Sequence, residues 1–254
     1  MSARPEPLPP ERRTIGQLVA ETIRTYAANF WPSLALGLGP AALTLGAYEV
    51  GWHPALAGIG IAYLVVATSS FMGGCLIVTK HRPSRRALAT AFGLGVFIVL
   101  PVLLLSFGLG LLGLAWLAFF GLAVPAALIE ELPAGDAFRR GIELGRVDYV
   151  HAFGALVALA LVVFLTQGML FSLLHGTSQQ AIAISAFLAS AVVQPILFIG
   201  GALLYLDQRA RLDRVAAPDS EGGSDADLHP ALEPHRAGGA DAEVEPRPAA
   251  GGES

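Results

Sequence analysis

A run of 43 residues without a single Asp, Glu, Lys, Arg or His, from Ala87 to Ile129, limits the folds open to this chain more than any other feature. A helix of about 20 residues crosses the roughly 30 Å hydrocarbon core of a bilayer, so the run is long enough to cross twice. The glycines of Gly108-Leu-Gly-Leu-Leu-Gly113 mark the turn between the two passes. The run therefore predicts a membrane hairpin with spans near 87–108 and 111–129.

The flanking segments have the same character. Apolar stretches near 31–50 and 55–78 are separated by a turn at 49–54, and the 58 residues from Tyr149 to Leu206 contain no Asp, Glu, Lys or Arg. The second of these regions has room for spans near 150–173 and 180–205, joined at 175–180. Only 14% of the chain is charged, against about 25% in typical soluble proteins. The sequence predicts an all-α, polytopic helical membrane protein with six transmembrane helices in three hairpins.

Two amphipathic helices are expected to lie in the membrane interface. Thr14-Ile-Gly-Gln17 has the spacing of a capping box, and apolar residues recur at helical spacing from there to Phe30. A polar interruption from Glu130 to Asp148 separates apolar from charged residues in the same way. The predicted organisation is a disordered N-terminus (1–13), a six-span membrane domain (14–214) and a disordered tail (215–254) with a net charge of −7.

All 16 Lys and Arg residues fall in segments that the six spans place on one side of the membrane. Four lie in the N-terminal segment, four in the loop 80–86, three in the helix 139–146 and five in the C-terminal region, whereas the three opposite turns contain none. Lys and Arg in short loops favour the cytoplasmic side. The pattern predicts that both termini are cytoplasmic.

The arginines at this boundary are a candidate interface for anionic lipid headgroups, although most such arginines only fix topology. The candidates are Arg82, Arg85, Arg86, Arg139, Arg140 and Arg146. Membrane lipids are accordingly the first expected partners. Small residues at i, i+4 spacing would also let helices pack closely, within this bundle, in a homo-oligomer or with a partner protein. They are Ser69/Gly73, Ser70/Gly74, Gly58/Ala62 and Ala181/Ser185/Ala189.

Nothing in the chain amounts to a catalytic, metal or cofactor site. The serine-hydrolase, zinc-protease, P-loop and paired Cys/His patterns are absent, and Cys75 is the only cysteine. The letters G-x-G-x-x-G at Gly108–Gly113 match a dinucleotide fingerprint, but that motif needs a strand before it and a helix after it, and here it falls at a hairpin tip. No nucleic-acid partner is expected either.

The polar pair Gln194-Pro195 is the most suggestive feature inside the spans. A proline frees a carbonyl in a helix, and a glutamine can donate a hydrogen bond to it or to a neighbouring helix. We interpret the pair as structural, at a kink. Pro40, Pro101 and Pro125 predict kinks for the same reason.

Three stretches resemble the membrane domain of membrane-bound glycerophosphodiester phosphodiesterases and its stand-alone bacterial relatives. They are Tyr26–Phe30 (YAANF), Val124–Arg140 (VPAALIEELPAGDAFRR), and Pro195 followed by Leu203–Arg211 (LLYLDQRAR). In that family the catalytic activity belongs to a separate soluble barrel, which this chain lacks. The resemblance implies an inner-membrane module whose own role is poorly defined, and it carries no catalytic residue onto this sequence.

Within the third stretch, Tyr205 fits the aromatic belt of a membrane boundary, and Arg209 lies beside it. Asp207 and Arg211 have the i,i+4 spacing of a helical ion pair. We expect that pair to orient the last helix.

The leading functional hypothesis from the sequence is a non-enzymatic membrane scaffold or accessory module. The alternative is a protein that handles a lipid or a small solute, and an intramembrane enzyme is the least supported reading. A deep polar cavity reaching Gln194 would favour the alternative, whereas solid packing of Leu, Ala and Gly would favour the scaffold.

Overall fold

The computed structural model describes residues 13–50, 54–105, 108–173 and 179–216, which are helical almost throughout and contain no strand. The predicted disorder of residues 1–13 and 215–254 lies almost wholly outside the described residues, as do parts of the predicted turns at 49–54 and 175–180, but Val215 and Ala216 belong to the last helix. The helices are α1 (Ile15–Ala28), α2 (Phe30–Val50), α3 (Ala55–Thr79), α4 (Arg85–Leu105), α5 (Gly110–Phe120), α6 (Ala123–Ile129), α7 (Ala134–Val147), α8 (Tyr149–Leu173) and α9 (Gln179–Ala216).

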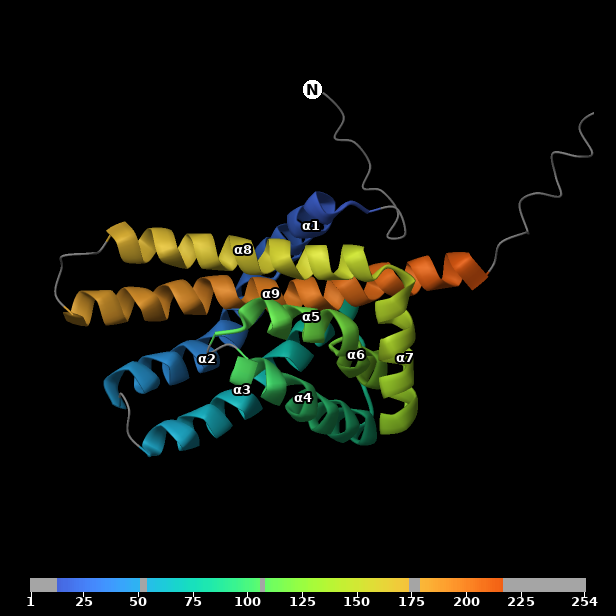
Figure 1. Cartoon of the computed structure of the whole chain (residues 1–254), viewed down its shortest axis with the longest axis horizontal. Helices are drawn as coiled ribbons and strands as arrows, with labels where there is room; N and C mark the ends of the chain where they lie inside the picture. Colours follow the sequence, from blue (N-terminus) through green and yellow to red (C-terminus); the bar gives the residue numbers. More distant parts are fainter. Residues whose placement is uncertain (1–12, 51–53, 106–107, 174–178, 217–254) are drawn as a thin grey trace, which may run out of the picture. The chain divides into compact units, whose positions relative to one another are not determined.

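Six segments of this part of the chain are long and apolar enough to cross a membrane. Each corresponds to one of the predicted spans, so the prediction of an all-α, multi-pass membrane protein is confirmed. Figure 1 shows the α2–α3 and α8–α9 hairpins running side by side with the shorter α4–α5 hairpin.

The first amphipathic helix, α1, begins at the predicted capping box. The Thr14 hydroxyl accepts a hydrogen bond from the Gln17 backbone N–H at 3.4 Å, and the Gln17 side chain accepts one from the Thr14 N–H at 2.9 Å. Its buried face carries Leu18, Thr22 and Tyr26 and packs against α8 and α9. Only Asn29 separates α1 from α2, so the chain turns directly from the amphipathic helix into the first span.

Helix α9 packs against α1, α2, α3 and α8, and glycines let the backbones of α2 and α3 approach it closely. A Cβ atom at Gly37 of α2 would lie 2.0 Å from the Ala191 carbonyl oxygen of α9. At Gly74 of α3 it would lie 2.9 Å from the Phe198 backbone. Ser70 and Gly74 are therefore buried inside this bundle, where the Ser70 hydroxyl also donates to the Leu36 carbonyl at 2.8 Å. This small-residue pair serves packing within one chain.

The predicted span at 111–129 corresponds to the candidate span Gly110–Ile129, within which the helix is interrupted between α5 and α6 at Gly121 and Leu122. Pro125 has no N–H to donate to the Gly121 carbonyl, which removes a hydrogen bond at this point. A Cβ atom at Gly121 would also lie 2.5 Å from the Leu117 carbonyl oxygen. The residues of α6 from Ala123 to Leu128 are all buried.

Helix α7 crosses the ends of the spans (Figure 1), as expected for an interfacial helix. Gly141 and Gly145 allow this placement, since a Cβ atom there would lie 2.6 Å from the Ala123 backbone nitrogen and 2.9 Å from the Phe119 carbonyl oxygen, respectively. The last helix differs from the prediction, because the expected span at 180–205 and its charged end form one continuous helix of 38 residues. The charged segment after Leu206 is thus held rigidly on the last span.

Candidate functional site

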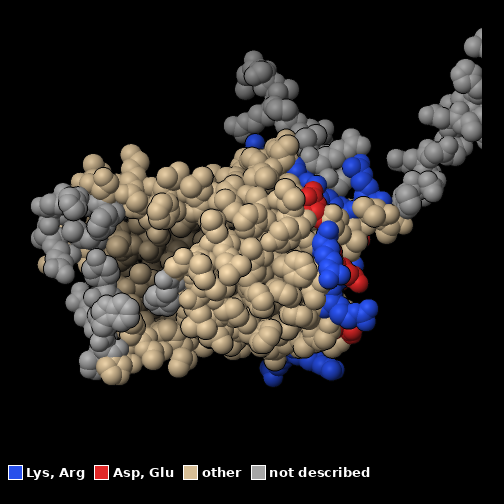
Figure 2. Space-filling model, viewed as in Figure 1, with Lys and Arg blue, Asp and Glu red and all other residues tan. Residues whose placement is uncertain are grey.

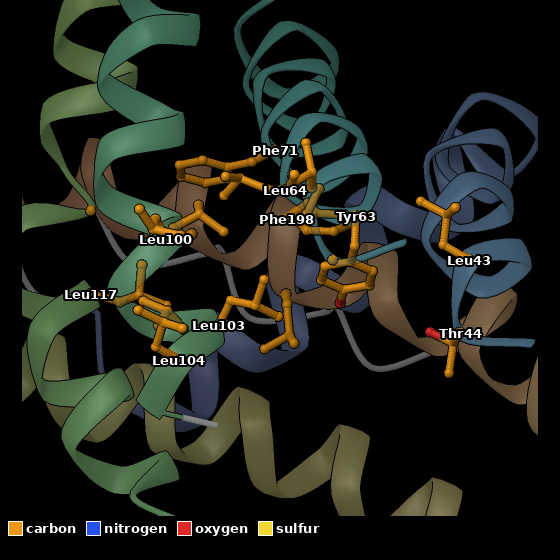
Figure 3. A pocket seen from close by; sticks show the side chains of 18 of the residues that line it. Leu43, Thr44, Tyr63, Leu64, Phe71, Leu100, Leu103, Leu104, Leu117 and Phe198 are labelled. Atoms are coloured by element: carbon orange, nitrogen blue, oxygen red, sulfur yellow. The ribbon is translucent and has the colours of Figure 1, made fainter. Parts of the chain in front are cut away.

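A cavity of about 760 Å³ lies between the helices (Figure 3). It is partly open, and residues of α2, α3, α4, α5, α8 and α9 contribute to its wall. Large apolar side chains dominate the lining, including Leu43, Leu64, Phe71, Leu100, Leu103 and Phe198. A volume of this size falls within the range of about 300–1,000 Å³ that is typical of ligand sites.

None of the described residues that line the cavity is Asp, Glu, Lys, Arg or His. The side-chain polar groups in the lining are the hydroxyls of Thr44 and Tyr63. The Thr44 hydroxyl donates to the Pro40 carbonyl of its own helix at 2.9 Å. The surface presented to an occupant is therefore almost wholly apolar.

On α3 and α4 the cavity lining lies in the half of the bundle that is remote from the charged residues. On α4 it runs from Val99 to Leu104, which begins about 21 Å along the helix from Arg85. On α3 it runs from Leu56 to Phe71, whereas the charged end of that helix follows Thr79. Figure 2 shows the molecule hollowed in the same half, with the visible Lys and Arg side chains gathered at the other end.

At the charged end, α9 makes ion pairs with segments that are far away in sequence. The fully buried Asp207 carboxylate lies 2.9 Å from the Arg13 guanidinium, just before α1. Arg211 lies 2.9 Å from the Asp148 carboxylate between α7 and α8, and it donates to the Arg13 carbonyl oxygen at 2.8 Å. The expected pair of Asp207 with Arg211 is therefore wrong: both residues bind other segments, because each side chain can reach an opposite charge across a helix junction.

Glu130, at the end of α6, joins two further elements, α7 and α9. It accepts a hydrogen bond from the Tyr205 hydroxyl of α9, and its carboxylate lies 3.4 Å from Arg140 of α7 and 3.7 Å from Arg209. Tyr205 is completely buried, so the prediction that it belongs to an aromatic belt is wrong. A buried tyrosine hydroxyl needs a hydrogen-bond partner, and Glu130 supplies it.

The six arginines predicted as a headgroup interface do not behave alike. Five are exposed, namely Arg82, Arg85, Arg86, Arg139 and Arg146. Arg140 is half-buried and lies between Glu130 and Glu143, 3.6 Å from the latter, so its charge is used inside the bundle.

The pair Gln194 and Pro195 lies inside α9, as predicted. Pro195 packs at the crossing with α2, where its Cγ atom would lie 2.9 Å from a Cβ atom at Gly37. The Gln194 side-chain oxygen is buried, and no described residue donates a hydrogen bond to it. Gln194 does not line the cavity. The deep polar cavity reaching Gln194, which was one of the two alternatives from the sequence, is therefore not observed.

Among the described residues, no group of three or more His, Cys, Asp or Glu side chains is placed to hold a metal ion. Comparison of the chain with models of protein families, with curated proteins and with solved structures finds no match.

Sequence reasoning did not find Arg13, Glu130 and Asp148 as the partners of α9. Glu130 directly follows one uncharged span and Asp148 directly precedes another. A carboxylate at such a membrane boundary is expected to pair with a cation, and this position is the signal that could have identified both residues. Which cation a carboxylate meets depends on contacts such as Arg13 with Asp207, 194 residues apart, and spacing in the sequence cannot reveal them.

Proposed function

We propose that this chain is a non-enzymatic lipid-binding protein of the bacterial inner membrane that holds a lipid acyl chain in its apolar cavity. The observation that carries the proposal is the combination of the cavity's volume, about 760 Å³, with a lining that has no charged side chain.

An apolar space of this size cannot stay empty. Apolar side chains around an unfilled space lose packing contacts, which destabilises a fold. The space is partly open, so bilayer lipid can reach it. The cavity must therefore be filled in the membrane.

Water is a poor occupant, because a buried water molecule needs two to four polar partners and apolar cavities stay dry. The two lining hydroxyls, of which Thr44 already bonds to its own helix, cannot support a water cluster. The surrounding bilayer offers acyl chains at high concentration, and their methylenes match Leu and Phe side chains in polarity. A lipid chain is the occupant that this lining fits best.

The distribution of charge supports an orientation in the membrane. The visible Lys and Arg residues gather at one end of the bundle (Figure 2), and such an end faces the cytoplasm in membrane proteins. We propose on this basis that both termini are cytoplasmic and that the part of the cavity lined by α3 and α4 lies in the opposite leaflet.

The resemblance to the membrane domain of glycerophosphodiester phosphodiesterases remains a proposal. What supports it is that its three stretches meet in space. Tyr26 packs against Leu203 and Ile199, and Tyr205 donates to Glu130. Residues from each stretch thus form one contact region around α9, which would explain why they occur together.

The scaffold role that the sequence favoured stays a prediction. The sequence offered two alternatives, a deep polar cavity reaching Gln194 or solid packing of Leu, Ala and Gly. Neither is observed, since the bundle contains a cavity and the lining of that cavity is apolar. We place lipid handling first because an unfilled apolar space requires an occupant, whereas a scaffold requires none.

Two glycines of α3 provide a matched test. Gly60 lines the cavity and Gly58 does not, yet a Cβ atom would meet nothing within 4 Å at either position. Gly60→Phe should fill part of the cavity, whereas Gly58→Phe should add the same ring outside it. We would extract both variants and the parent protein from their host membrane into detergent, and then count retained lipids by native mass spectrometry.

We expect the parent and Gly58→Phe to retain one lipid per chain and Gly60→Phe to lose most of it. Equal retention by all three proteins would contradict the proposal, as would a parent protein that carries no lipid after mild extraction.

A further inference from the structure

The cations at the charged end fall into two classes. Five described arginines lie in ion pairs with carboxylates: Arg13, Arg24, Arg140, Arg209 and Arg211. The other cations are exposed and form no ion pair with a described residue: Lys80, Arg82, Arg85, Arg86, Arg139, Arg146 and Arg214. The second class is where an external anion could bind without breaking the fold.

On α7, acids are interleaved with the exposed cations. Asp136 precedes Arg139 by three residues, and Glu143 follows it by four and precedes Arg146 by three, so opposite charges are neighbours on the helix surface. Arg146 also lies over the Phe119 ring, 5.8 Å from its centroid. The outer face of α7 is therefore close to neutral.

The connection between α3 and α4 is different. We define the basic loop as residues 80–86, with the cations Lys80, Arg82, Arg85 and Arg86, and neither the loop nor α3 or α4 contains an acid. The acid that reaches it is Glu131, which accepts a hydrogen bond from the Ser84 backbone N–H at 3.2 Å and lies 3.3 Å from the His81 ring. Four positive charges thus face one carboxylate that is already bonded to other groups.

The basic loop is also held in a fixed position. The Lys80 N–H donates to the Leu76 carbonyl at the end of α3, and the Ser84 hydroxyl accepts from the Ala87 N–H at the start of α4. Glu131 ties the middle of the loop to the segment between α6 and α7. The cations therefore project from an anchored backbone at the end of two membrane spans, which is the level of the lipid headgroups.

We propose that the basic loop is a binding surface for the phosphate groups of anionic lipid headgroups, and that α7 is not. Arginine guanidinium groups pair with phosphate through two parallel hydrogen bonds, and this loop offers three of them beside a lysine. The surface is separate from the cavity, whose lining lies toward the other end of the same two helices.

The competing explanation is that these residues only set the orientation of the protein during insertion. A measurement on purified protein in nanodiscs removes that explanation, because the two leaflets have the same composition and orientation no longer matters.

The test compares two double variants that each remove two charges. Arg85→Gln/Arg86→Gln changes the basic loop, and Arg139→Gln/Arg146→Gln is the matched control on α7. Each protein is placed in nanodiscs of phosphatidylcholine with a minor share of phosphatidylglycerol, and the preference for phosphatidylglycerol is measured with spin-labelled lipids.

A basic residue near an anionic surface contributes about 1 kcal/mol, which is about fivefold in affinity. We therefore expect the loop variant to lower the preference for phosphatidylglycerol by roughly 5- to 25-fold and the α7 variant to leave it within about twofold. Equal losses in the two variants would overturn the assignment in favour of net charge, and no loss in the loop variant would overturn it outright. Thermal unfolding of each variant confirms that a loss is not due to misfolding.

Discussion

Replacing Gly37 by alanine should separate α2 from α9 at their closest crossing. The new Cβ atom would lie 2.0 Å from the Ala191 carbonyl oxygen and 2.8 Å from its carbon, whereas ordinary contacts begin at 3.4 Å. The obstructing atoms are backbone atoms of a helix, so they cannot turn aside as a side chain would. The contact must open from 2.0 Å to at least 3.4 Å, which moves the two helices apart by about 1.4 Å.

A matched control lies on the same helix. Gly46 is also inside α2, but a Cβ atom there would meet nothing within 4 Å. Forcing extra atoms into a packed interior costs about 1–3 kcal/mol, while alanine favours a helix over glycine by roughly 0.5–1 kcal/mol. Gly37→Ala should therefore be less stable than Gly46→Ala. Both variants gain the same helix propensity, so the difference between them is the packing cost alone, about 1–3 kcal/mol.

Thermal unfolding in detergent measures this difference. For a domain of this size, about 1 kcal/mol corresponds to roughly 2–4 °C, so Gly37→Ala should unfold about 2–12 °C below Gly46→Ala. Equal midpoints for the two variants, or a higher midpoint for Gly37→Ala, would refute the close crossing of α2 and α9.

Two further predictions concern the charged end. Hydrogen bonds from Ser84, and then from His81, hold the pKa of Glu131 below its ordinary value near 4.5. The contacts of ionised Glu131 therefore stabilise the fold at pH values above its ordinary pKa, and this stabilisation is lost as the pH falls through the lowered pKa. Acidification should lower the unfolding temperature of the parent protein more than that of Glu131→Gln. Asp207→Asn should destabilise by about 3–5 kcal/mol in the same assay, because it removes the charge of a fully buried carboxylate and leaves the half-buried Arg13 without it. Glu143→Gln, which alters an exposed pair with Arg140, should cost less than about 1 kcal/mol and serves as its control.

The spans and the amphipathic helices could be predicted because they depend on local composition. A run without charge from Ala87 to Ile129 has no stable place in water, and the capping box at Thr14 and Gln17 is satisfied within four residues. The physical causes of the spans and of the helix cap lie within the segments themselves, so both could be predicted without the rest of the fold.

The break before Pro125 and the contacts of α9 depend on tertiary structure. Pro125 predicted a kink, and the interruption at Gly121 and Leu122 lies where α7 packs closely against α5 and α6 at Gly145 and Gly141. Hydropathy counts apolar residues and does not show where a helix changes direction. The partners of Tyr205 and Asp207 lie 75 and 194 residues away, so no local pattern contains them.

The cavity forms because the polar contacts that join the helices are concentrated at one end of the bundle. At the charged end, α9 is joined to α1 through Arg13, to α6 through Glu130 and to the α7–α8 junction through Asp148. Toward the other end, α5 extends for only 11 residues, about 16 Å, before the break at Gly121, and the α4–α5 hairpin stops short of its neighbours (Figure 1). The α2–α3 and α8–α9 hairpins therefore have no third hairpin between their far halves. A bundle closed by polar contacts at one end and lacking a filling helix at the other leaves an apolar space that lipid can enter, which is why the Gly60→Phe variant tests the architecture as well as the function.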